Sequence, residues 1–336
     1  MPTLFAFVIL MALMVDHFLG EPPVRWHPVV WMGNALERCA PWALPSPSSK
    51  MYPRPTSGDM DVEARDWMAF SRGAFVWTAL AAFVSIASWS LQWAVMQAPL
   101  WLAVALLGFA LKPLLAWRML RTEVQAVEAA LQVSLVAGRE RLGWLVSRDV
   151  TQLSESQVRE SAIESLAENL NDSVVAPIFW FLVLGLPGAA LYRFANTADA
   201  MWGYKGVYKG RNWEWAGKWA ARVDDVLSWF PARLTALALA ISAGGLAPGQ
   251  LRREAGRTAS PNSGWPMAAM ALALGVCLHK PGAYALNAKG RTPEAADTAA
   301  ALRLAGLGLL SLLVIVFITQ SAVGLLAHRP VLGGAI

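Results

Sequence analysis

The chain has 336 residues, of which 56% are hydrophobic and only 15% are charged, and its mean hydropathy is +0.42. This composition excludes an ordinary soluble domain. The net charge of +5 is not gathered into a basic stripe with interleaved aromatic residues, so the sequence also argues against a nucleic-acid partner.

Long apolar stretches indicate that the lipid bilayer is the solvent. Crossing about 30 Å of hydrocarbon takes roughly 20 apolar residues in a helix. We therefore predict membrane spans at 73–96, 98–120, 227–246 and 299–327, the last being a C-terminal transmembrane helix. Stretches 3–15, 174–191 and 265–278 are shorter or broken by Gly and Pro, and we expect them to be membrane-embedded without assigning them as crossings. The predicted fold class is an all-α integral membrane protein, a multi-span helical bundle with broken or re-entrant helices and cytoplasmic amphipathic helices, forming one domain over residues 1–336.

The distribution of basic residues predicts the topology. Lys and Arg occur in every long polar loop but not in the turn 96–99, which places the basic loops in the cytoplasm. With the 96–99 turn on the periplasmic side, the segments 174–200 and 227–280 must each enter and leave on one side, and the Gly185-Leu186-Pro187-Gly188 break is the expected re-entrant apex. Many of the 17 tryptophans stand at the ends of apolar runs and are expected at the lipid–water interface: Trp26, Trp31, Trp89, Trp93, Trp202, Trp213, Trp215 and Trp219.

Three further segments have simple predictions. The Pro- and Ser-rich stretch 41–62 is expected to be a mobile loop. The pattern Ser154-x-x-Gln157 predicts a capping box that opens an amphipathic helix over 154–169, and apolar residues at helical spacing predict a second amphipathic helix over 122–137. Cys39 and Cys277 have neither disulfide nor metal-ligand spacing and are expected to be free thiols.

An acidic run between residues 164 and 172 is the most informative candidate site. On a helix, Glu164, Glu168 and Asp172 are each four positions apart and project from one face, where like charges repel. A magnesium ion, which prefers one or two carboxylates with phosphate oxygens and water, would offset that repulsion. The alternative is a solvated acidic face with Asp172 as the N-cap of the next helix.

Further polar residues flank apolar segments, at a depth where an unpaired charge is costly. Cationic side chains among them suit phosphate, and acidic or amide side chains suit a metal ion. These candidates are Arg148, Asp149, Asn196, Asp199, Lys205, Tyr208, Arg222, Asp224, Asp225 and Arg233. The residues from Arg222 to Asp225 could equally form a local ion pair at a helix end.

Two more clusters complete the set. Prolines after Glu21 and His27 enforce an extended backbone, so that Asp16, Glu21 and His27 are held in a fixed turn after the first helix. The small-residue loop from Ser260 to Pro266, which includes Asn262, could present backbone amides to an anion. The chain contains no GxxxxGK[ST], GxGxxG, GxSxG or HExxH motif, so any use of ATP proceeds without a Walker loop.

The order of these motifs resembles the CobD/CbiB family of membrane-bound cobalamin-biosynthesis proteins, the adenosylcobinamide-phosphate synthases. The resemblance runs from Asp16 to about Leu278 and rests on seven blocks: D-x4-E-P-P-x3-H-P-V (16–29), R-D-V-T (148–151), E-S-x-A-E-N-x-x-D-S-V-V-A-P (164–177), L-P-G-A-x-x-Y-R-x-x-N-T-x-D-A-M-x-G-Y-K (186–205), A-R-x-D-D (221–225), P-A-R-L-T-A (231–236) and S-P-N-S-G-W-P-x-A-A-M-A (260–271). The chain departs from the family pattern at Glu21, where the family usually has Asp, and at Ser173, where it usually has Gly.

The resemblance implies an amide ligase of the bacterial inner membrane. It would join (R)-1-amino-2-propanol, or its O-phosphate, to a propionate of adenosylcobyric acid, with ATP as co-substrate and Mg²⁺ as cofactor. Other cobalamin-biosynthesis proteins are further candidate partners, and the active site would face the cytoplasm.

The chain offers a residue for each role that such a ligation needs. We expect Glu164, Glu168 and Asp172, with Asp199, to hold magnesium. Arg148, Lys205, Arg222 and Arg233 are expected to contact phosphates, and His27 or Asp225 to position the amine. Two other classes share the membrane signals: a transporter of corrinoids or other solutes, and a non-catalytic sensor of the AmpE type. Polar residues concentrated in loops and helix ends favour the enzyme.

Overall fold

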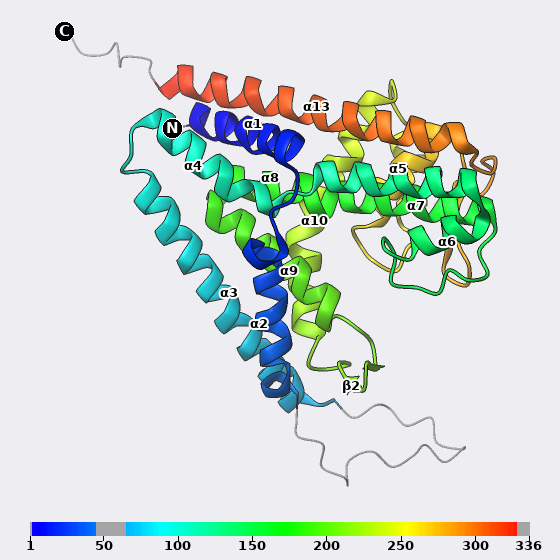
Figure 1. The fold of residues 1–336 in the computed structure, drawn as a ribbon, viewed down its shortest axis with the longest axis horizontal. Coiled ribbons are helices and arrows are strands. Elements are labelled where there is room, and N and C mark those ends of the chain that lie inside the picture. The colour runs from blue at the N-terminus through cyan, green and yellow to red at the C-terminus, as the bar shows by residue number, and fades with distance from the viewer. Residues whose placement is uncertain (1, 45–64, 328–336) are drawn as a thin grey trace.

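The computed structural model describes residues 2–44 and 65–327, which form helices with two short hairpins of strands. Figure 1 shows α13 running beside α1 along one side of the molecule, α3 crossing at an angle, and α5, α6 and α7 grouped together. The elements in chain order are α1 (Pro2–Leu19), η1 (Val24–Trp26), α2 (Pro28–Ala43), α3 (Trp67–Val95), α4 (Leu100–Leu111), η2 (Lys112–Leu114), α5 (Trp117–Val133), α6 (Leu135–Leu142), α7 (Glu155–Leu170), the π-helix η3 (Asn171–Val175), α8 (Ala176–Leu184), α9 (Leu186–Trp202), β1 (Val207–Tyr208), β2 (Arg211–Asn212), α10 (Lys218–Ser242), α11 (Pro248–Ala255), α12 (Gly264–Leu274), β3 (Leu278–Lys280), β4 (Tyr284–Leu286) and α13 (Ala295–Ala327).

This architecture confirms the all-α membrane class. In the described part of the chain, three helical stretches are long and apolar enough to cross a membrane: Trp67–Val95, Leu100–Val133 and Ala295–Val323. A fourth span predicted at 227–246 is not among them, because the helix there, α10, carries Arg233 and other polar side chains within its apolar half. The loop predicted at 41–62 lies outside the described residues from 45 onward, and its first residues, Pro41–Ala43, still belong to α2.

The predicted break at 185–188 is confirmed as the turn of a helical hairpin. Gly185 has φ +73°, a conformation that favours glycine, and it separates α8 from α9, which pack against each other. The backbone N–H of Leu186 donates to Oε1 of Gln92 at 2.6 Å, near the end of α3. The tip of the α8–α9 hairpin therefore lies at the same end of α3 as the 96–99 turn, and the polar residues 193–199 lie at its open end.

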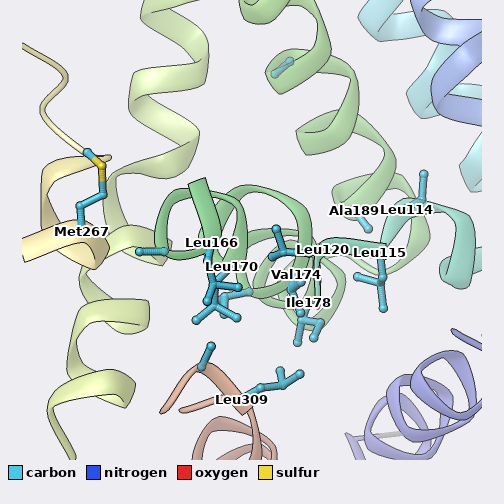
Figure 2. Close-up of a cluster of buried hydrophobic side chains, with 14 of the residues drawn as sticks. Leu114, Leu115, Leu120, Leu166, Leu170, Val174, Ile178, Ala189, Met267 and Leu309 are labelled. Atoms are coloured by element: carbon cyan, nitrogen blue, oxygen red, sulfur yellow. The ribbon is translucent and has the colours of Figure 1, made fainter. Parts of the chain in front are cut away.

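Helix α7 occupies the centre of the bundle. The capping box predicted at its start is confirmed, with Ser154 and Gln157 bonding each other's backbone. The prediction of an amphipathic helix exposed to the cytoplasm is wrong, since most of α7 is buried against α5, α6, α12 and α13. Figure 2 shows Leu166 and Leu170 of α7 in a buried cluster with Leu120, Val174, Met267 and Leu309.

Ion pairs fix α7 to its neighbours where apolar packing ends. Arg159 on α7 donates to both carboxylate oxygens of Glu128 on α5, at 2.9 and 3.2 Å, and Thr298 on α13 donates to the same carboxylate at 2.9 Å. The N–H of His279 on β3 donates to Glu160 at 3.0 Å. These bonds hold the β3–β4 hairpin and the helices α5 and α13 around α7.

Two of the tryptophans assigned to the interface lie in the core instead. Trp202 and Trp213 are 1% and 2% exposed and stack on each other with ring centroids 5.3 Å apart, because the chain after α9 folds back over the end of that helix. Trp26, Trp31, Trp89 and Trp93 are exposed, as predicted. Both cysteines are free, as predicted.

Candidate functional site

A pocket of about 180 Å³ opens beside α7, between the loop before that helix and the β3–β4 hairpin. We call it the α7 pocket, and its charged and hydroxyl-bearing lining residues are Ser147, Arg148, Ser161, Glu164, Ser165, Glu168, Lys280 and Tyr284. Arg148 donates a short hydrogen bond to the hydroxyl of Ser161 and a longer one, 3.4 Å, to Glu164. Acidic and basic side chains therefore meet across one small space.

A second group surrounds Asp172, where α7 passes through the π-helix η3 into α8. The Asp172 carboxylate accepts hydrogen bonds from Asn171 at 2.8 Å, Asn196 at 3.3 Å and the Tyr192 hydroxyl at 3.4 Å. Arg193 donates to the Asp172 carbonyl at 3.1 Å and to the Ser173 hydroxyl at 3.2 Å. π-Helical turns recur at functional sites because they shift the register of the side chains that follow. We call this group, with Asp199 and Asp224, the η3 cluster.

The alternative assignment of Asp172 as a helix N-cap is wrong. Helical backbone continues through residue 172 into α8, and no side-chain cap forms at the start of η3. The three acidic residues of the run instead follow one another along the same side of the bundle. Glu168 lies between Glu164 and Asp172 and is repelled electrostatically by both.

A third group, the Asp16 cluster, contains a residue that the sequence analysis did not select. Lys112 lies 2.7 Å from Glu21 and 3.3 Å from Asp16, with its side chain only 4% exposed. His27 Nε2 bonds to Glu21 at 3.1 Å, and Asp16 also accepts the N–H of Arg118 at 2.7 Å. The predicted pairing of acid and imidazole is therefore present, with a buried lysine at its centre.

A fourth group joins α10 to the loop before α12. Asn262 donates to the Asp225 carbonyl at 2.7 Å and accepts from Arg233 at 3.0 Å. The Arg233 guanidinium also lies over the rings of Trp229 and Trp265. Ser260 does not leave its loop amides free for an anion, since its hydroxyl accepts the N–H groups of Asn262 and Ser263 at 3.2 and 3.3 Å.

Electrostatics links the first two groups into one acidic site. Burial, together with repulsion from Asp172 and Glu164, raises the pKa of Glu168 to about 7. Burial and the neighbouring Asp225 raise the pKa of Asp199 to about 6, and the pKa of Asp224 lies well above its usual range for the same kind of reason. Glu168 and Asp224 are both only half-buried by surface area, which is consistent with carboxylates lining a recess. One oxygen of Asp224 has no hydrogen-bond partner among the described residues.

Four predicted residues lie outside these groups. Asp149 is exposed, and its carboxylate accepts the N–H of Thr151 at 2.9 Å, so it holds a local turn. Lys205 and Arg222 are exposed and form no ion pair with any residue that the structure describes, which makes the proposed local pair from Arg222 to Asp225 wrong. Tyr208 stacks on Tyr204, with centroids 3.6 Å apart.

The carboxylates of the η3 cluster and the α7 pocket fit a magnesium ion only in part. Within residues 2–44 and 65–327, no three His, Cys, Asp or Glu side chains converge closely enough to hold a metal ion by themselves. Mg²⁺ commonly takes one or two carboxylates and completes its shell with water and phosphate oxygens. Burial and mutual repulsion raise the pKa values of these carboxyls, and one Asp224 oxygen has no partner among the described residues, so a bound cation would stabilise their ionised forms.

Sequence reasoning missed Lys112, Tyr192, Arg193, Lys280 and Tyr284. A lysine inside an apolar run, as at Lys112, is itself a functional signal, because unpaired charge is costly there. Tyr192 and Arg193 stand inside the motif 186–205 but no role was given to them. Lys280 and Tyr284 follow the last motif, so nothing local marked them, and only the hairpin brings them to α7.

Comparison with known proteins identifies the family. The model of the family described as CobD/Cbib protein matches residues 9–306. The chain belongs to this family. That match includes all four groups of polar residues described above.

The alignments with curated relatives in this family cover most of this chain and most of each relative. The Cobalamin biosynthesis protein CobD of Chromobacterium violaceum is 41% identical over 314 residues, covering 89% of this chain and 91% of the relative. The protein of the same name from Brucella suis is 37% identical over 344 aligned residues, which cover 95% of this chain and 97% of the relative. The "Probable cobalamin biosynthesis protein CobD" of Methanothermobacter thermautotrophicus is 39% identical over 286 residues, covering 83% and 86%. No solved structure matches the chain.

Proposed function

We propose that this protein acts in cobalamin biosynthesis as a membrane-bound amide ligase. It would join 1-amino-2-propanol, or its O-phosphate, to a propionate of adenosylcobyric acid, with ATP and Mg²⁺. Family membership supports the pathway, and the names of the curated relatives support it further. The observation that carries the reaction class is the run of half-buried carboxylates from Glu168 to Asp224, with raised pKa values and cationic side chains beside it.

A carboxylate does not react with an amine in water, so the acid must first be activated. In the proposed reaction, a propionate oxygen attacks the γ-phosphorus of ATP, ADP leaves, and an acyl phosphate forms. The amine nitrogen then attacks the acyl carbon, phosphate leaves, and the nitrogen gives up one proton. Each step moves charge onto phosphate oxygens, and a site that stabilises this charge accelerates the reaction.

The η3 cluster is the part of the protein best suited to the nucleotide and the metal ion. We propose that one or two magnesium ligands come from Glu168, Asp172 and Asp199, as the sequence suggested, and from Asp224, with phosphate oxygens and water completing the shell. The ion would neutralise negative charge on the phosphates. Glu164 is reassigned to substrate binding, because its partner in the structure is Arg148.

Arg193 is our leading candidate for contact with phosphate oxygens. It lies within the acidic cluster, and its Nε atom is buried without a partner among the described residues. Lys205 and Arg222, which are exposed and unpaired, are candidates for the outer phosphates. Arg233 is less suited, since its guanidinium is already held by Asn262, the Pro261 carbonyl and two indole rings.

The two residues predicted to position the amine already have partners inside the protein. His27 is bonded to Glu21, and Asp225 accepts from Asn262 through its carbonyl, with its carboxylate 3.4 Å from the same amide. The Asp16 cluster is close enough for Glu21 to influence Arg193 electrostatically, and the N–H of Ala116 donates to the Ser173 carbonyl at 3.0 Å. We therefore propose that this cluster holds the polypeptide around η3 in position.

Apart from Lys112, the polar side chains of the four groups lie outside the three helical stretches that could cross a membrane, which supports an enzyme supplied from the aqueous side more than a transporter with a site in mid-membrane. We propose the inner membrane as the location and the cytoplasmic side as the face of the site. The test of function is incubation of the purified protein with adenosylcobyric acid, each form of the amine, ATP and Mg²⁺, with mass spectrometry of the corrinoid. Formation of the amide supports the proposal, and its absence from folded protein rejects it.

A further inference from the structure

The α7 pocket has charges of both signs but is small. Its volume of about 180 Å³ lies below the roughly 300–1,000 Å³ of pockets that enclose drug-sized ligands, so a corrin ring or a whole nucleotide does not fit inside it. Arg148 and Lys280 supply the positive charges, and Glu164 and Glu168 the negative ones. Such a lining matches a small molecule that carries a cation at one end and an anion at the other.

Buried polar atoms in this pocket lack partners within the part of the chain that the structure describes. Glu164 is only 5% exposed, yet its Oε1 atom makes no hydrogen bond, while Oε2 is held by Arg148 at 3.4 Å. The Nε atom of Arg148 is likewise buried and unpartnered. A buried charged group without a hydrogen bond is costly unless a ligand supplies the missing one.

The β3–β4 hairpin brings two more groups to the same space. Lys280 lies at the exposed rim of the pocket, where its charge acts on both Glu164 and Glu168, and it forms no ion pair with any described residue. The Tyr284 hydroxyl donates to the sulfur of Met267 at 3.7 Å, a weak acceptor, and it lies close enough to Glu164 to favour the ionised form of that carboxylate. The hairpin is held against α7 by the bond from His279 to Glu160.

We propose that the α7 pocket is the binding site for the amine substrate, with Glu164 holding the ammonium group and Arg148 with Lys280 holding the phosphate of the O-phosphorylated form. This inference rests on the proposed function. The orientation follows from the neighbours of the pocket: Glu168, beside Glu164, is also within electrostatic reach of Asp172 and Asp199. An ammonium group at Glu164 therefore faces the η3 cluster, where the activated acid would form, and the phosphate faces the solvent rim. In this proposal Lys280, which lies outside every motif noted in the sequence, determines the preference for the phosphorylated amine over the free amino alcohol.

Binding to the full-length protein in lipid nanodiscs tests this site without the reaction. Isothermal titration calorimetry would measure the affinity for 1-amino-2-propanol O-phosphate, for the free amino alcohol and for inorganic phosphate, with neither ATP nor corrinoid present. Lys280→Gln is expected to weaken binding of the O-phosphate at least tenfold and to change binding of the free amino alcohol less than twofold. Glu164→Gln is expected to weaken binding of both amines at least tenfold and to leave binding of inorganic phosphate unchanged.

Matched controls separate charge at the site from charge elsewhere. Lys289→Gln and Glu140→Gln remove exposed charges that form no ion pair with any described residue, and both should bind like the unmodified protein. The unfolding temperature of each variant, measured in the same nanodiscs, shows whether it is folded. Folded Lys280→Gln and Glu164→Gln proteins that bind the O-phosphate with unchanged affinity would overturn the assignment.

The outcome also distinguishes this inference from the proposed function. Selective binding of the O-phosphate that depends on Lys280 and Glu164, in a protein that forms no amide, would leave the site standing and reject the ligase. Amide formation whose KM for the amine is unchanged in both variants would support the ligase and reject the site.

Discussion

The carboxylate of Glu164 is held by the guanidinium of Arg148 through one oxygen only, at 3.4 Å, and its other oxygen is buried without a partner. An ion pair with a purely structural role normally satisfies the remaining lone pairs of the carboxylate, because an unmet acceptor costs about 1–3 kcal/mol when buried. The pair between Arg159 on α7 and Glu128 on α5 is satisfied in this way, by three bonds from the arginine, one from Gln132 and one from Thr298. This contrast is the reason for assigning a structural role to the start of α7 and for proposing that its middle binds a ligand.

Glu168→Gln is expected to reduce amide formation at least 100-fold without destabilising the fold. The charge of Glu168 is repelled by Asp172, Glu164 and Asp199, so removing it relieves repulsion while taking away a metal ligand. Turnover is measured by mass spectrometry of the corrinoid, and stability by the unfolding temperature, which should be unchanged or higher. Glu140→Gln, on an exposed residue, is the control. Near-normal turnover of the Glu168→Gln protein would remove this residue from the site.

Magnesium affinity is expected to fall as the pH falls from 8 to 6. Without metal, the carboxyls of Glu168 and Asp199 have pKa values of about 7 and about 6, so protons occupy an increasing share of these ligands over this range. Metal binding must displace those protons, which lowers the apparent affinity by up to about tenfold per pH unit for each proton displaced. Titration of Mg²⁺ against initial rate at fixed ATP gives the affinity at each pH. A half-saturating Mg²⁺ concentration that is the same at pH 6 and pH 8 would contradict the assignment.

Lys112→Met is expected to destabilise the protein by about 3–5 kcal/mol, because it leaves the fully buried Asp16 carboxylate without its ion pair and leaves Glu21 with His27 alone. Unfolding in detergent, followed by tryptophan fluorescence, measures the change. Lys289→Met, on an exposed lysine, should change the stability by less than about 0.5 kcal/mol. If Lys112→Met unfolds like that control, then the Asp16 cluster does not hold α1, η2 and the 20–27 segment together.

Gly203→Ala is expected to disturb the η3 cluster from outside it. A Cβ atom on Gly203 would lie 2.0 Å from the Asp199 carboxylate and 2.7 Å from the Asp199 carbonyl, so the side chain of Asp199 must move. Magnesium affinity should then drop at least tenfold. Gly249→Ala is the control, since the nearest atom to its new Cβ is 3.9 Å away.

A double variant separates displacement of Asp199 from a general loss of structure. If Gly203→Ala acts through Asp199, then the double variant with Asp199→Asn should bind Mg²⁺ no more weakly than the Asp199→Asn variant alone. Additive losses in the double variant would show that Gly203 acts elsewhere.

Local signals in the sequence account for much of the fold. The capping box at Ser154, the break at Gly185 and the apolar length of α3 and α13 each depend on residues within one segment, and each was predicted. Burial was harder to predict. The many charged residues of α7 predict a surface helix. In the structure, Arg159 and Glu160 are bonded to residues on α5 and β3, which are far away in the sequence. Bonds to those partners offset the cost of burying the charges of α7, and no pattern within residues 154–169 reveals which residues the partners are.

The same limit applies to the candidate site. The stack of Glu164, Glu168 and Asp172 follows from helical spacing and was predicted, because adjacent turns of one helix determine it. Lys280 lies on a hairpin more than a hundred residues further along the chain than Glu164, and three α-helices, α2 to α4, separate Lys112 from Glu21 in the sequence. Positions such as these depend on tertiary packing, so composition and spacing do not reveal them.

The measurement that tests the central claim most directly is single-turnover amide formation by the purified protein in nanodiscs. Adenosylcobyric acid, 1-amino-2-propanol O-phosphate, ATP and Mg²⁺ are supplied, and corrinoid and nucleotide products are quantified together by mass spectrometry. The account predicts one amide and one ADP per turnover, none without Mg²⁺, and neither product from the Glu168→Gln protein. A folded, unmodified protein that retains the corrinoid but forms neither amide nor ADP would contradict it.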